Sequence, residues 1–404
     1  MASQGLLYPI SSELRPSEIL APPARAAQPA AGIVPVMKPQ LPSAARILPY
    51  LETIDARRWY SNVGPLVTEL ESQLGRQLGF GNEKGVITCA NATVGITVAL
   101  LARRPAAGSL CLMPAWTFVA TPHAARAAGM QPWFHDVDRR TWALDPDQVT
   151  ESLKRMPHPV GAVIVVSPFG APVRIDAWQN FEDRTGIKVV VDAAAGFDTA
   201  RCSRIPQVVS LHATKILGAG EGGFISTSDA RLLERLRACC NFGFHGSRIA
   251  LFTALNAKMS EYHAAVGLAS LALWRETRQR HARIAEWYRE VIPRLDRVSL
   301  QPGYGHGWVS GTTSILLPPR SKARIAAHLR QSGIETKEWW GQGCHSQPAF
   351  MDSPRGVLPV TEELGARVLG LPHFPDMQKH DVERVADALS EALSGRIRER
   401  RRRA

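Results

Sequence analysis

The sequence contains no apolar run long enough to cross a membrane and no pattern typical of a secreted chain. No stretch of about 18 uninterrupted apolar residues occurs, which argues against a membrane-spanning helix. The N-terminus has no basic region leading into an apolar core, so we expect no signal peptide. The predicted compartment is therefore the cytoplasm.

Cysteine and histidine are present without the spacing that a disulfide framework or a metal site needs. The six cysteines show no paired metal spacing and include the adjacent Cys239 and Cys240, so reduced thiols are expected. The twelve histidines show no H-x-x-x-H pattern. We therefore predict no metal.

The formal net charge is +12, but the basic residues are not arranged as in a nucleic-acid-binding protein. Arginines are spread over predicted helices such as 275–289 and concentrate at 396–403, where we expect a solvated tail. No helix-turn-helix or zinc-finger pattern is present, so no nucleic-acid partner is expected. A basic surface can instead attract a nucleotide diphosphate.

Short apolar runs alternate with helical stretches, which predicts an α/β fold with a mostly parallel central sheet sandwiched by helices. With 404 residues and 45% hydrophobic content, the chain can build a large and a smaller core. We expect a long amphipathic helix over 261–291. The predicted strands are 86–89, 110–113, 131–134, 161–167, 189–192, 208–211 and 223–227. The predicted division is a Pro/Ala-rich lead at 1–45, a large cofactor-binding domain at 46–285, a small C-terminal α+β domain at 286–395 and a basic tail at 396–404.

Lys215 lies in a pattern that points to an aldehyde cofactor carrying a phosphate. It ends the segment Ser-Leu-His-Ala-Thr-Lys (210–215), precedes the glycine-rich segment 218–223, and follows a valine run that ends at Asp192. A lysine amine condenses with an aldehyde when its pKa is lowered, and a carboxylate keeps the cofactor's ring nitrogen protonated. Singly, such an Asp often caps a turn and such a Lys is solvated. In this order and spacing they predict pyridoxal phosphate (PLP), with Lys215 catalytic and Asp192 on the cofactor.

A phosphate site is expected where an apolar strand, 86–89, leads into an apolar helix. Ala92, Thr93 and Val94 then lie at the helix N-terminus, whose free N–H groups bind anions. In isolation, Thr93 is also a plausible N-cap residue.

These features resemble the PLP-dependent nucleotide-sugar aminotransferases of the DegT type, which share the fold of aspartate aminotransferase (PLP fold type I). The resemblance runs from about Trp59 to about Pro372. Besides the Lys215 region, it rests on segments 61–65, 90–94, 113–121, 135–138, 144–145 and 256–261.

The resemblance implies roles for further residues. Phe118 would lie against the cofactor ring, with Trp116 as a rival, and Ser210 would donate its hydroxyl to the phosphate. Asn256 would reach the phosphate from the neighbouring subunit, which implies a homodimer with shared active sites. The candidates for the substrate pocket are Tyr60, His345, Gln347 and Trp339, although Trp339 and Trp340 are equally compatible with packing.

The chain departs from the family pattern at three places. Only 17 residues separate Asp192 from Ser210, where the family usually has a longer segment. Ala195 stands where the family commonly has Gln or His, and His212 or His263 is a possible substitute; His212 could equally face the core or the solvent. Lys258 replaces the usual Arg, which loses the forked geometry.

The resemblance implies a ping-pong transamination from an amino acid, glutamate by resemblance, to a nucleotide-linked keto-sugar. Such products enter polysaccharides or glycosylated metabolites. Two alternatives stay open: an aminotransferase for a non-sugar ring ketone such as a cyclitol, and a non-catalytic PLP-binding regulator. A regulator would be expected to lack Lys215 or Asp192, and a related dehydratase subgroup carries histidine in place of the lysine; here both residues are present.

Overall fold

The structure, a computed structural model, describes residues 32–81, 84–106, 108–156 and 158–394. Its contacts divide the chain into residues 1–33, of which only Gly32 and Ile33 are described, and residues 34–404. Most of the predicted lead and all of the predicted basic tail lie outside the described residues. The second unit alone is considered below.

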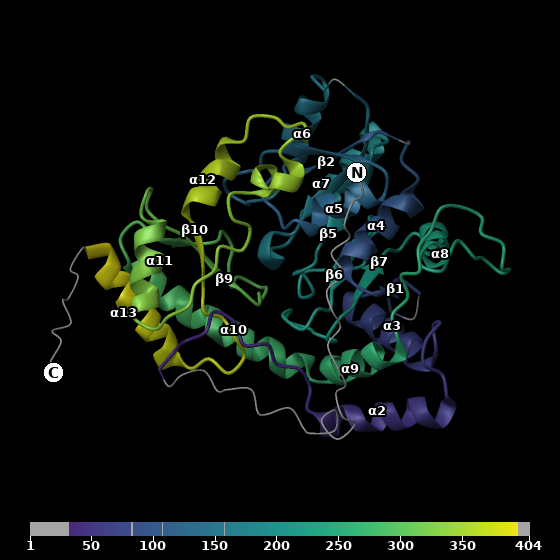
Figure 1. Ribbon diagram of the computed structural model, residues 1–404, viewed down its shortest axis with the longest axis horizontal. Helices are drawn as coiled ribbons and strands as arrows, with labels where there is room; N and C mark the ends of the chain where they lie inside the picture. Colours follow the sequence, from purple (N-terminus) through teal and green to yellow (C-terminus); the bar gives the residue numbers. More distant parts are fainter. Residues whose placement is uncertain (1–31, 82–83, 107, 157, 395–404) are drawn as a thin grey trace, which may run out of the picture. The chain divides into compact units, whose positions relative to one another are not determined.

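A seven-stranded sheet forms the centre of this unit (Figure 1). Strand β7 is antiparallel to both of its neighbours, and the other neighbouring pairs are parallel, which confirms the mostly parallel sheet. The spatial order is β1-β7-β6-β5-β4-β2-β3. The strands are β1 (Val86–Cys89), β2 (Leu110–Pro114), β3 (Gln131–His135), β4 (Val160–Val166), β5 (Lys188–Asp192), β6 (Gln207–Ser210) and β7 (Gly223–Ser226).

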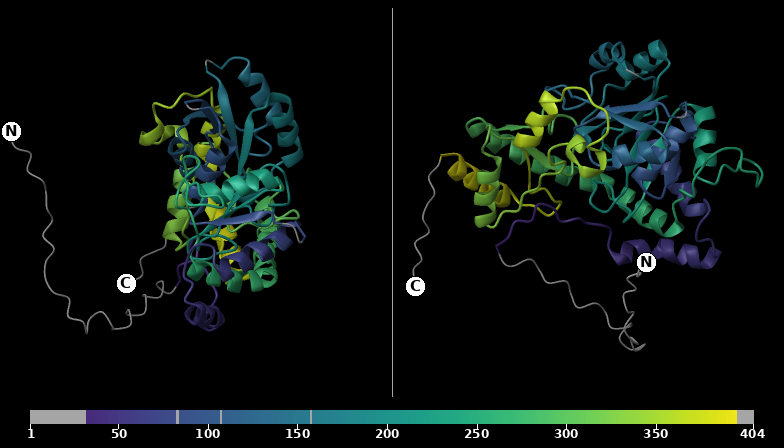
Figure 2. Two further views of the ribbon diagram at one scale, coloured as in Figure 1. Left: turned by 90° about the vertical axis from the view of Figure 1, so that its right-hand side faces the viewer. Right: turned by 45° about the horizontal axis from the view of Figure 1, so that its top comes forward.

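Apolar side chains alternate between the two faces of this sheet, so each face carries its own core. In β5, Val189 and Val191 enter one core and Val190 enters the other, as the two-residue period of a strand requires. The first core includes α3 (Pro65–Leu78), α7 (Ile175–Thr185) and α9 (Glu261–Ala272), and the second includes α4 (Ala92–Arg103), α5 (Ala120–Ala127) and α8 (Ala230–Cys239). In Figure 2 the purple helix α2 (Ala44–Arg57) lies along the green α9, and α6 (Pro146–Leu153) packs with α7.

The long helix predicted over 261–291 is two helices, α9 and α10 (Trp274–Val291), which meet at Leu273. The backbone of Leu273 leaves the helical region, with ψ near 2°. The helix α9 packs with α2 and α3, whereas α10 packs with α13 (Lys379–Ser394). Trp274 at the start of α10 still belongs to the same core as α9, and Tyr288 near its end belongs to the C-terminal core.

A separate three-stranded antiparallel sheet lies in the C-terminal part of the chain. Its order is β10-β9-β8, from strands β8 (Ser299–Leu300), β9 (Thr313–Leu316) and β10 (Val368–Leu371). With α10, α11 (Lys322–Gln331) and α13 it encloses its own apolar core, and α12 (Pro359–Arg367) precedes β10. The described residues also form four short 3-10 helices: η1 (Pro168–Gly170), η2 (Ile292–Arg294), η3 (Cys344–Ser346) and η4 (Pro348–Phe350). A domain boundary near residue 285 stays a prediction.

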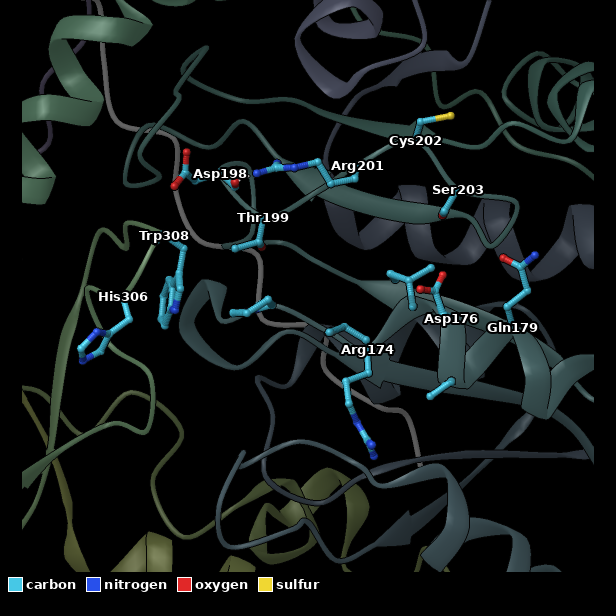
Figure 3. A pocket seen from close by; sticks show the side chains of 15 residues that line it. Arg174, Asp176, Gln179, Asp198, Thr199, Arg201, Cys202, Ser203, His306 and Trp308 are labelled. Carbon is cyan, nitrogen blue, oxygen red and sulfur yellow. Dashed lines mark hydrogen bonds between the residues drawn. The ribbon is translucent and has the colours of Figure 1, made fainter.

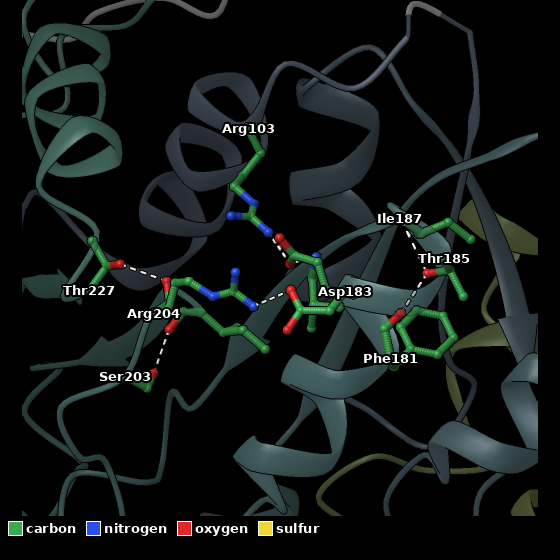
Figure 4. A network of polar contacts seen from close by, with 11 residues as sticks. Arg103, Phe181, Asp183, Thr185, Ile187, Ser203, Arg204 and Thr227 are labelled. Atoms are coloured by element: carbon green, nitrogen blue, oxygen red, sulfur yellow. Dashed lines mark hydrogen bonds and ion pairs between the residues drawn. The ribbon is translucent and has the colours of Figure 1, made fainter.

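Ion pairs and hydrogen bonds of charged side chains connect helices with one another and with the sheet. Arg103 of α4 pairs with Glu182 of α7, whose carboxylate also accepts from the backbone N–H of Val189 at 3.0 Å (Figure 4). The buried Glu261, at the start of α9, accepts from the N–H groups of Leu66 and Val67 and so caps α3. Among the described helices, none is both long and apolar enough to cross a membrane.

Candidate active site

A cavity of about 680 Å³ lies at the carboxyl ends of β4, β5 and β6. Parallel neighbouring strands bring these ends together, because Asp192 is in register with Val166 on one side and Val208 on the other. Such an edge is the usual ligand site of an open α/β sheet. Eight predicted site residues line the cavity: Ala92, Thr93, Val94, Phe118, Asp192, Ser210, Lys215 and the substrate-pocket candidate Trp339.

Lys215 lies in the loop between β6 and β7. This loop turns back on itself at Gly220 and Gly222, both in the left-handed region, and the backbone N–H of Lys215 donates to His212 at 2.9 Å. Within the described residues, its amino group has no hydrogen-bond or ion-pair partner. Burial lowers the pKa of Lys215, and the negative charge of Asp192 acts in the opposite direction. The net effect shifts the equilibrium of this amine towards its neutral form.

Asp192 ends β5 and is only 5% exposed. One carboxylate oxygen accepts from the hydroxyl of Thr121 at 2.7 Å, and the other from the backbone N–H of Ala194 at 3.1 Å. Burial raises the pKa of Asp192, whereas these two hydrogen bonds and the charge of Lys215 lower it. The carboxylate is thus held in one orientation inside the cavity.

The N-terminus of α4 supplies an anion site. The side chain of Asn91 caps the helix by accepting from the N–H of Val94 at 2.9 Å. Ala92 and Thr93 open the helix, so their N–H groups have no acceptor within it. The backbone of Gly223 passes close by, since a Cβ there would lie 2.9 Å from the nitrogen of Ala92.

The hydroxyl of Ser210 completes this corner of the cavity. It accepts from the backbone N–H of His212 at 3.2 Å, which leaves its own proton available for a ligand. Free helix N–H groups next to a hydroxyl donor match the needs of a phosphate.

Phe118 and Trp116 were rival candidates for the aromatic contact with the cofactor ring. Phe118 lines the cavity and is 55% exposed. Trp116 does not line the cavity; it is 2% exposed and packs against the lining residues Phe169 and Trp340. Ala195 lines the cavity without a polar group. The placement favours Phe118 as the ring contact, and its role stays a prediction.

Of the two histidines considered as substitutes near Ala195, only His212 lines the cavity. Its Nδ1 hydrogen-bonds the hydroxyl of Thr214 at 2.8 Å, and its Nε2 lies 3.6 Å from Glu221. His263 hydrogen-bonds the hydroxyl of Ser260 through Nδ1 at 2.9 Å, and the same hydroxyl caps the start of α9 by accepting from the backbone N–H of His263 at 3.2 Å.

Four predicted site residues lie outside the cavity lining: Asn256, Tyr60, His345 and Gln347. Asn256 is exposed, and its side-chain oxygen accepts a hydrogen bond from the amino group of Lys258 at 2.7 Å. Tyr60 is 46% exposed and stacks with Tyr262 at 6.3 Å. His345 lies in η3, and burial lowers its pKa. Their roles stay predictions.

Sequence reasoning missed several lining residues, among them Phe169, Trp340, Thr117, Glu221 and Met37. Thr117 lies in a segment that carried the family resemblance, and Glu221 lies in the glycine-rich segment 218–223. The others come from turns and loops whose position depends on packing between distant parts of the chain. No local pattern marks them.

A second hollow, of about 750 Å³, contains none of the predicted cofactor residues. Figure 3 shows it between Arg174 and Asp176 at the start of α7 and the loop that carries Trp308. The segment 198–203, part of the short connection between Asp192 and Ser210, forms part of its wall. No group of three metal-ligating side chains occurs in the part of the chain that the structure describes.

The main cavity fits PLP by its donor set. It combines an unpartnered lysine amine, a fixed buried carboxylate, free N–H groups at a helix start and an exposed aromatic ring. These are the four groups that an aldehyde, a ring nitrogen, a phosphate and a flat ring require. Their convergence in one cavity supports the cofactor prediction.

Comparison with known proteins agrees with a PLP-binding site, because the similar proteins are aminotransferases. The sequence model of the DegT/DnrJ/EryC1/StrS aminotransferase family matches residues 43–390. The crystal structure of DesI with its TDP-sugar product is 33% identical, with a TM-score of 0.80, and the match covers 90% of this chain and 94% of that one. A structure from Bacillus cereus ATCC 10987, assigned as a PLP-dependent aminotransferase, has a TM-score of 0.84 at 28% identity, covering 88% and 99% of the two chains. The dTDP-4-amino-4,6-dideoxy-D-glucose transaminase of Escherichia coli is 25% identical over 375 residues, 88% of this chain and 98% of its own.

Proposed function

The chain belongs to the DegT/DnrJ/EryC1/StrS aminotransferase family, and from this membership we propose that it transfers an amino group from glutamate to a nucleotide-linked keto-sugar. The family match and the transaminase relatives identify a PLP-dependent sugar aminotransferase. The donor and the nucleotide-linked acceptor are the proposal. Two relatives whose names refer to TDP- or dTDP-linked sugars support such an acceptor.

The observation that carries the proposal is the meeting of Lys215, Asp192 and the start of α4 in one cavity. When bound there, PLP supplies an electron sink that makes the C–H bond beside an attached amine acidic. The amine of Lys215, with its pKa lowered by burial, takes the proton from the donor's α-carbon. In the second half-reaction, the same amine delivers a proton to the former carbonyl carbon of the sugar.

The other residues hold the reacting groups. Asp192, fixed by Thr121 and Ala194, keeps a positive charge on the cofactor ring nitrogen. Ser210 and the free N–H groups at the start of α4 would hold the phosphate of PLP. In this proposal Lys215 transfers the protons, and the other residues position the reacting groups.

The visible absorption spectrum of the purified protein tests this function. Wild-type protein should carry the yellow colour of lysine-linked cofactor, lose it when glutamate is added, and regain it with a keto-sugar nucleotide. Lys215→Ala should show neither change, while the exposed Lys154→Ala serves as a matched lysine control. A wild-type protein whose colour ignores glutamate would refute the donor. Recovery with a keto-cyclitol but with no keto-sugar nucleotide would refute the acceptor.

We also propose that the enzyme is a homodimer in which Asn256 acts on the partner's site. The segment 241–256 exposes three large apolar side chains, Phe242 (46%), Ile249 (65%) and Leu251 (57%). Exposed apolar residues grouped on one segment are typical of a protein contact. Asn256, at the end of this segment, does not line the cavity of its own chain.

Mixing two inactive variants tests the shared site. In a heterodimer of Lys215→Ala and Asn256→Ala chains, one site would keep an intact Lys215 and receive an intact Asn256 from the other chain. Activity should therefore reappear after co-expression. Continued inactivity, or a monomeric wild-type protein in sedimentation, would contradict the proposal.

A further inference from the structure

Glu221 brings a negative charge into the active-site cavity that no lysine or arginine of the described residues balances. Its backbone is held in the turn between β6 and β7, where the N–H of Leu211 donates to Gly222 at 2.9 Å and the N–H of Ala213 donates to Gly220 at 2.8 Å. The Glu221 side chain lines the cavity and is 58% exposed. Within the described part of the chain, its partner is the imidazole of His212, 3.6 Å away.

The hydrogen bonds of His212 fix its tautomer. Its Nδ1 accepts from the backbone N–H of Thr214 at 3.2 Å, so the neutral ring carries its proton on Nε2, the nitrogen nearest Glu221. The ring is uncharged in this tautomer, and 3.6 Å is longer than a hydrogen bond. Glu221 therefore lacks a strong counter-charge in a single chain.

A bound cofactor makes this cavity more negative still. Among the described residues that line it are two carboxylates, Asp192 and Glu221, one lysine, Lys215, and no arginine. The phosphate of PLP adds about 1.5–2 negative charges at neutral pH. In the proposed function Asp192 faces a positive ring nitrogen, whereas Glu221 and the phosphate have no such match. Positive charge from outside the lining would stabilise this arrangement.

Lys258 lies on an outward face of the chain together with Asn256. The backbone of this segment is anchored, because the carbonyl of Ala257 accepts from the N–H of Ala90 at 2.7 Å. Ala257 and Met259 are 0% and 2% exposed, whereas Asn256 is exposed and Lys258 is half-buried. This alternation of burial places Asn256 and Lys258 on the same side of the segment, away from the core.

The amino group of Lys258 has no carboxylate partner within the described residues. It donates to the side-chain oxygens of Asn256 at 2.7 Å and Asn241 at 2.8 Å, and it lies 4.6 Å from the centre of the Phe242 ring. An ammonium group has three protons, so one remains for a further acceptor. Burial lowers the pKa of Lys258, and a neighbouring carboxylate would favour its charged form.

We infer that Glu221 forms an intersubunit ion pair with Lys258 of the partner subunit, and that this pair completes the active site. The inference rests on the proposed homodimer, in which Asn256 reaches the partner's site. Lys258 is hydrogen-bonded to Asn256 and therefore enters the partner's cavity beside it. In a two-fold dimer each chain supplies one carboxylate and one ammonium, so the pair forms twice. It holds Asn256 in place at the phosphate end of the cavity.

Charge reversal in separate chains tests the pair by sedimentation of the holoenzyme. Glu221→Lys and Lys258→Glu should each raise the dimer dissociation constant about 100-fold or more, because like charges then meet at two contacts. A mixture of the two variants should form a heterodimer with a dissociation constant within about 10-fold of wild type. One contact of that heterodimer joins the two substituted side chains and the other joins the two native ones, so both join opposite charges. Glu383→Lys, at an exposed position of α13, is the matched control and should dimerise like wild type.

Cofactor retention is the second readout and needs no turnover. In equilibrium dialysis each single variant should bind PLP about 10-fold more weakly than wild type, and the mixture should regain the wild-type affinity. The milder Glu221→Gln should weaken the dimer about 10-fold, which keeps the pair testable if a reversed charge prevents folding.

Three results would overturn the inference, and they separate it from the proposed function. A wild-type dimer whose two charge variants show no preference for the heterodimer would exclude the pair and leave the homodimer and the transaminase standing. Rescue in the double variant Glu221→Lys/Lys258→Glu, without rescue in the mixture, would place the pair within one chain. A monomeric wild-type holoenzyme would remove the proposed homodimer, and the ion pair with it.

Discussion

Replacing Thr121 by valine should move the acid limb of the activity profile to higher pH. The Thr121 hydroxyl donates to Asp192 at 2.7 Å, and both residues are buried. Valine keeps the size of threonine but has no hydroxyl, so one carboxylate oxygen loses its donor. Burial already raises the pKa of Asp192, and the Thr121 hydrogen bond acts against that rise. Without it, the pKa rises further.

The size of the shift follows from the strength of the lost bond. A hydrogen bond to an ionised group contributes about 1.5–3 kcal/mol. One pKa unit corresponds to about 1.4 kcal/mol, so the pKa of Asp192 should rise by about 1–2 units. Below that pKa the carboxyl is protonated and no longer holds the proton on the cofactor ring. The rate of the glutamate half-reaction should therefore fall at a pH about 1–2 units higher than in wild type.

Thr117 provides the control. Because Thr121 gives its only proton to Asp192, the 2.8 Å contact between the two threonines requires Thr117 to be the donor. Thr117→Val removes a bond one step away from the carboxylate and should shift the acid limb less, and Thr121→Ser should restore the wild-type profile. The assay is the single-turnover loss of yellow colour with glutamate across pH. An unmoved acid limb in Thr121→Val, or an equal shift in Thr117→Val, would refute this reasoning.

Three further predictions concern stability and cofactor binding. Gly64→Ala should lower the free energy of unfolding in urea by about 1–3 kcal/mol, because the added Cβ would lie 2.7 Å from the carboxyl carbon of Glu261 and displace the cap of α3; an unchanged value would contradict this. Gly223→Ala should weaken cofactor binding about 10-fold or more in equilibrium dialysis, since its Cβ would lie 2.9 Å from the nitrogen of Ala92 at the phosphate site; unaltered affinity would argue against that site. Burial lowers the pKa of His281 from 6.5 to about 4, so the unfolded chain is protonated first as the pH falls. The contribution of His281 to the free energy of unfolding should be fully present above pH 6.5 and should decrease by about 3 kcal/mol towards pH 4. In urea titrations, His281→Asn should reduce this dependence of the unfolding free energy on pH. An equal dependence in the variant would exclude His281 as its source.

The cofactor end of the site was predictable because it is built from local sequence. Asp192 ends its strand, Ser210 ends the next, and Lys215 follows within one loop. Neighbouring parallel strands place their carboxyl ends side by side, so a correct strand assignment already brings these residues together. The same holds for Ala92 and the start of α4, where the strand-to-helix pattern alone locates the free N–H groups.

The parts of the chain that sequence reasoning missed depend on contacts between distant residues. Thr121 donates a hydrogen bond to Asp192, which lies 71 residues later in the sequence. Glu261 accepts from Leu66 at the start of α3, although 195 residues separate the two. The break at Leu273 was not predicted because no glycine or proline marks it in the sequence. Asn256, Tyr60 and His345 do not line the cavity of a single chain, and their roles depend on the proposed dimer or on a bound substrate.

The sequence by itself determined the fold class and indicated the residues that we propose to hold PLP, because periodicity and strand-end residues carry that information locally. Only the tertiary structure decided which aromatic residues form the cavity wall. Phe169 and Trp340 stack because a strained turn after β4 is bound by Gln301, Ser310 and Thr199 from distant loops. Side-chain packing between remote segments sets that geometry, and no local pattern encodes it.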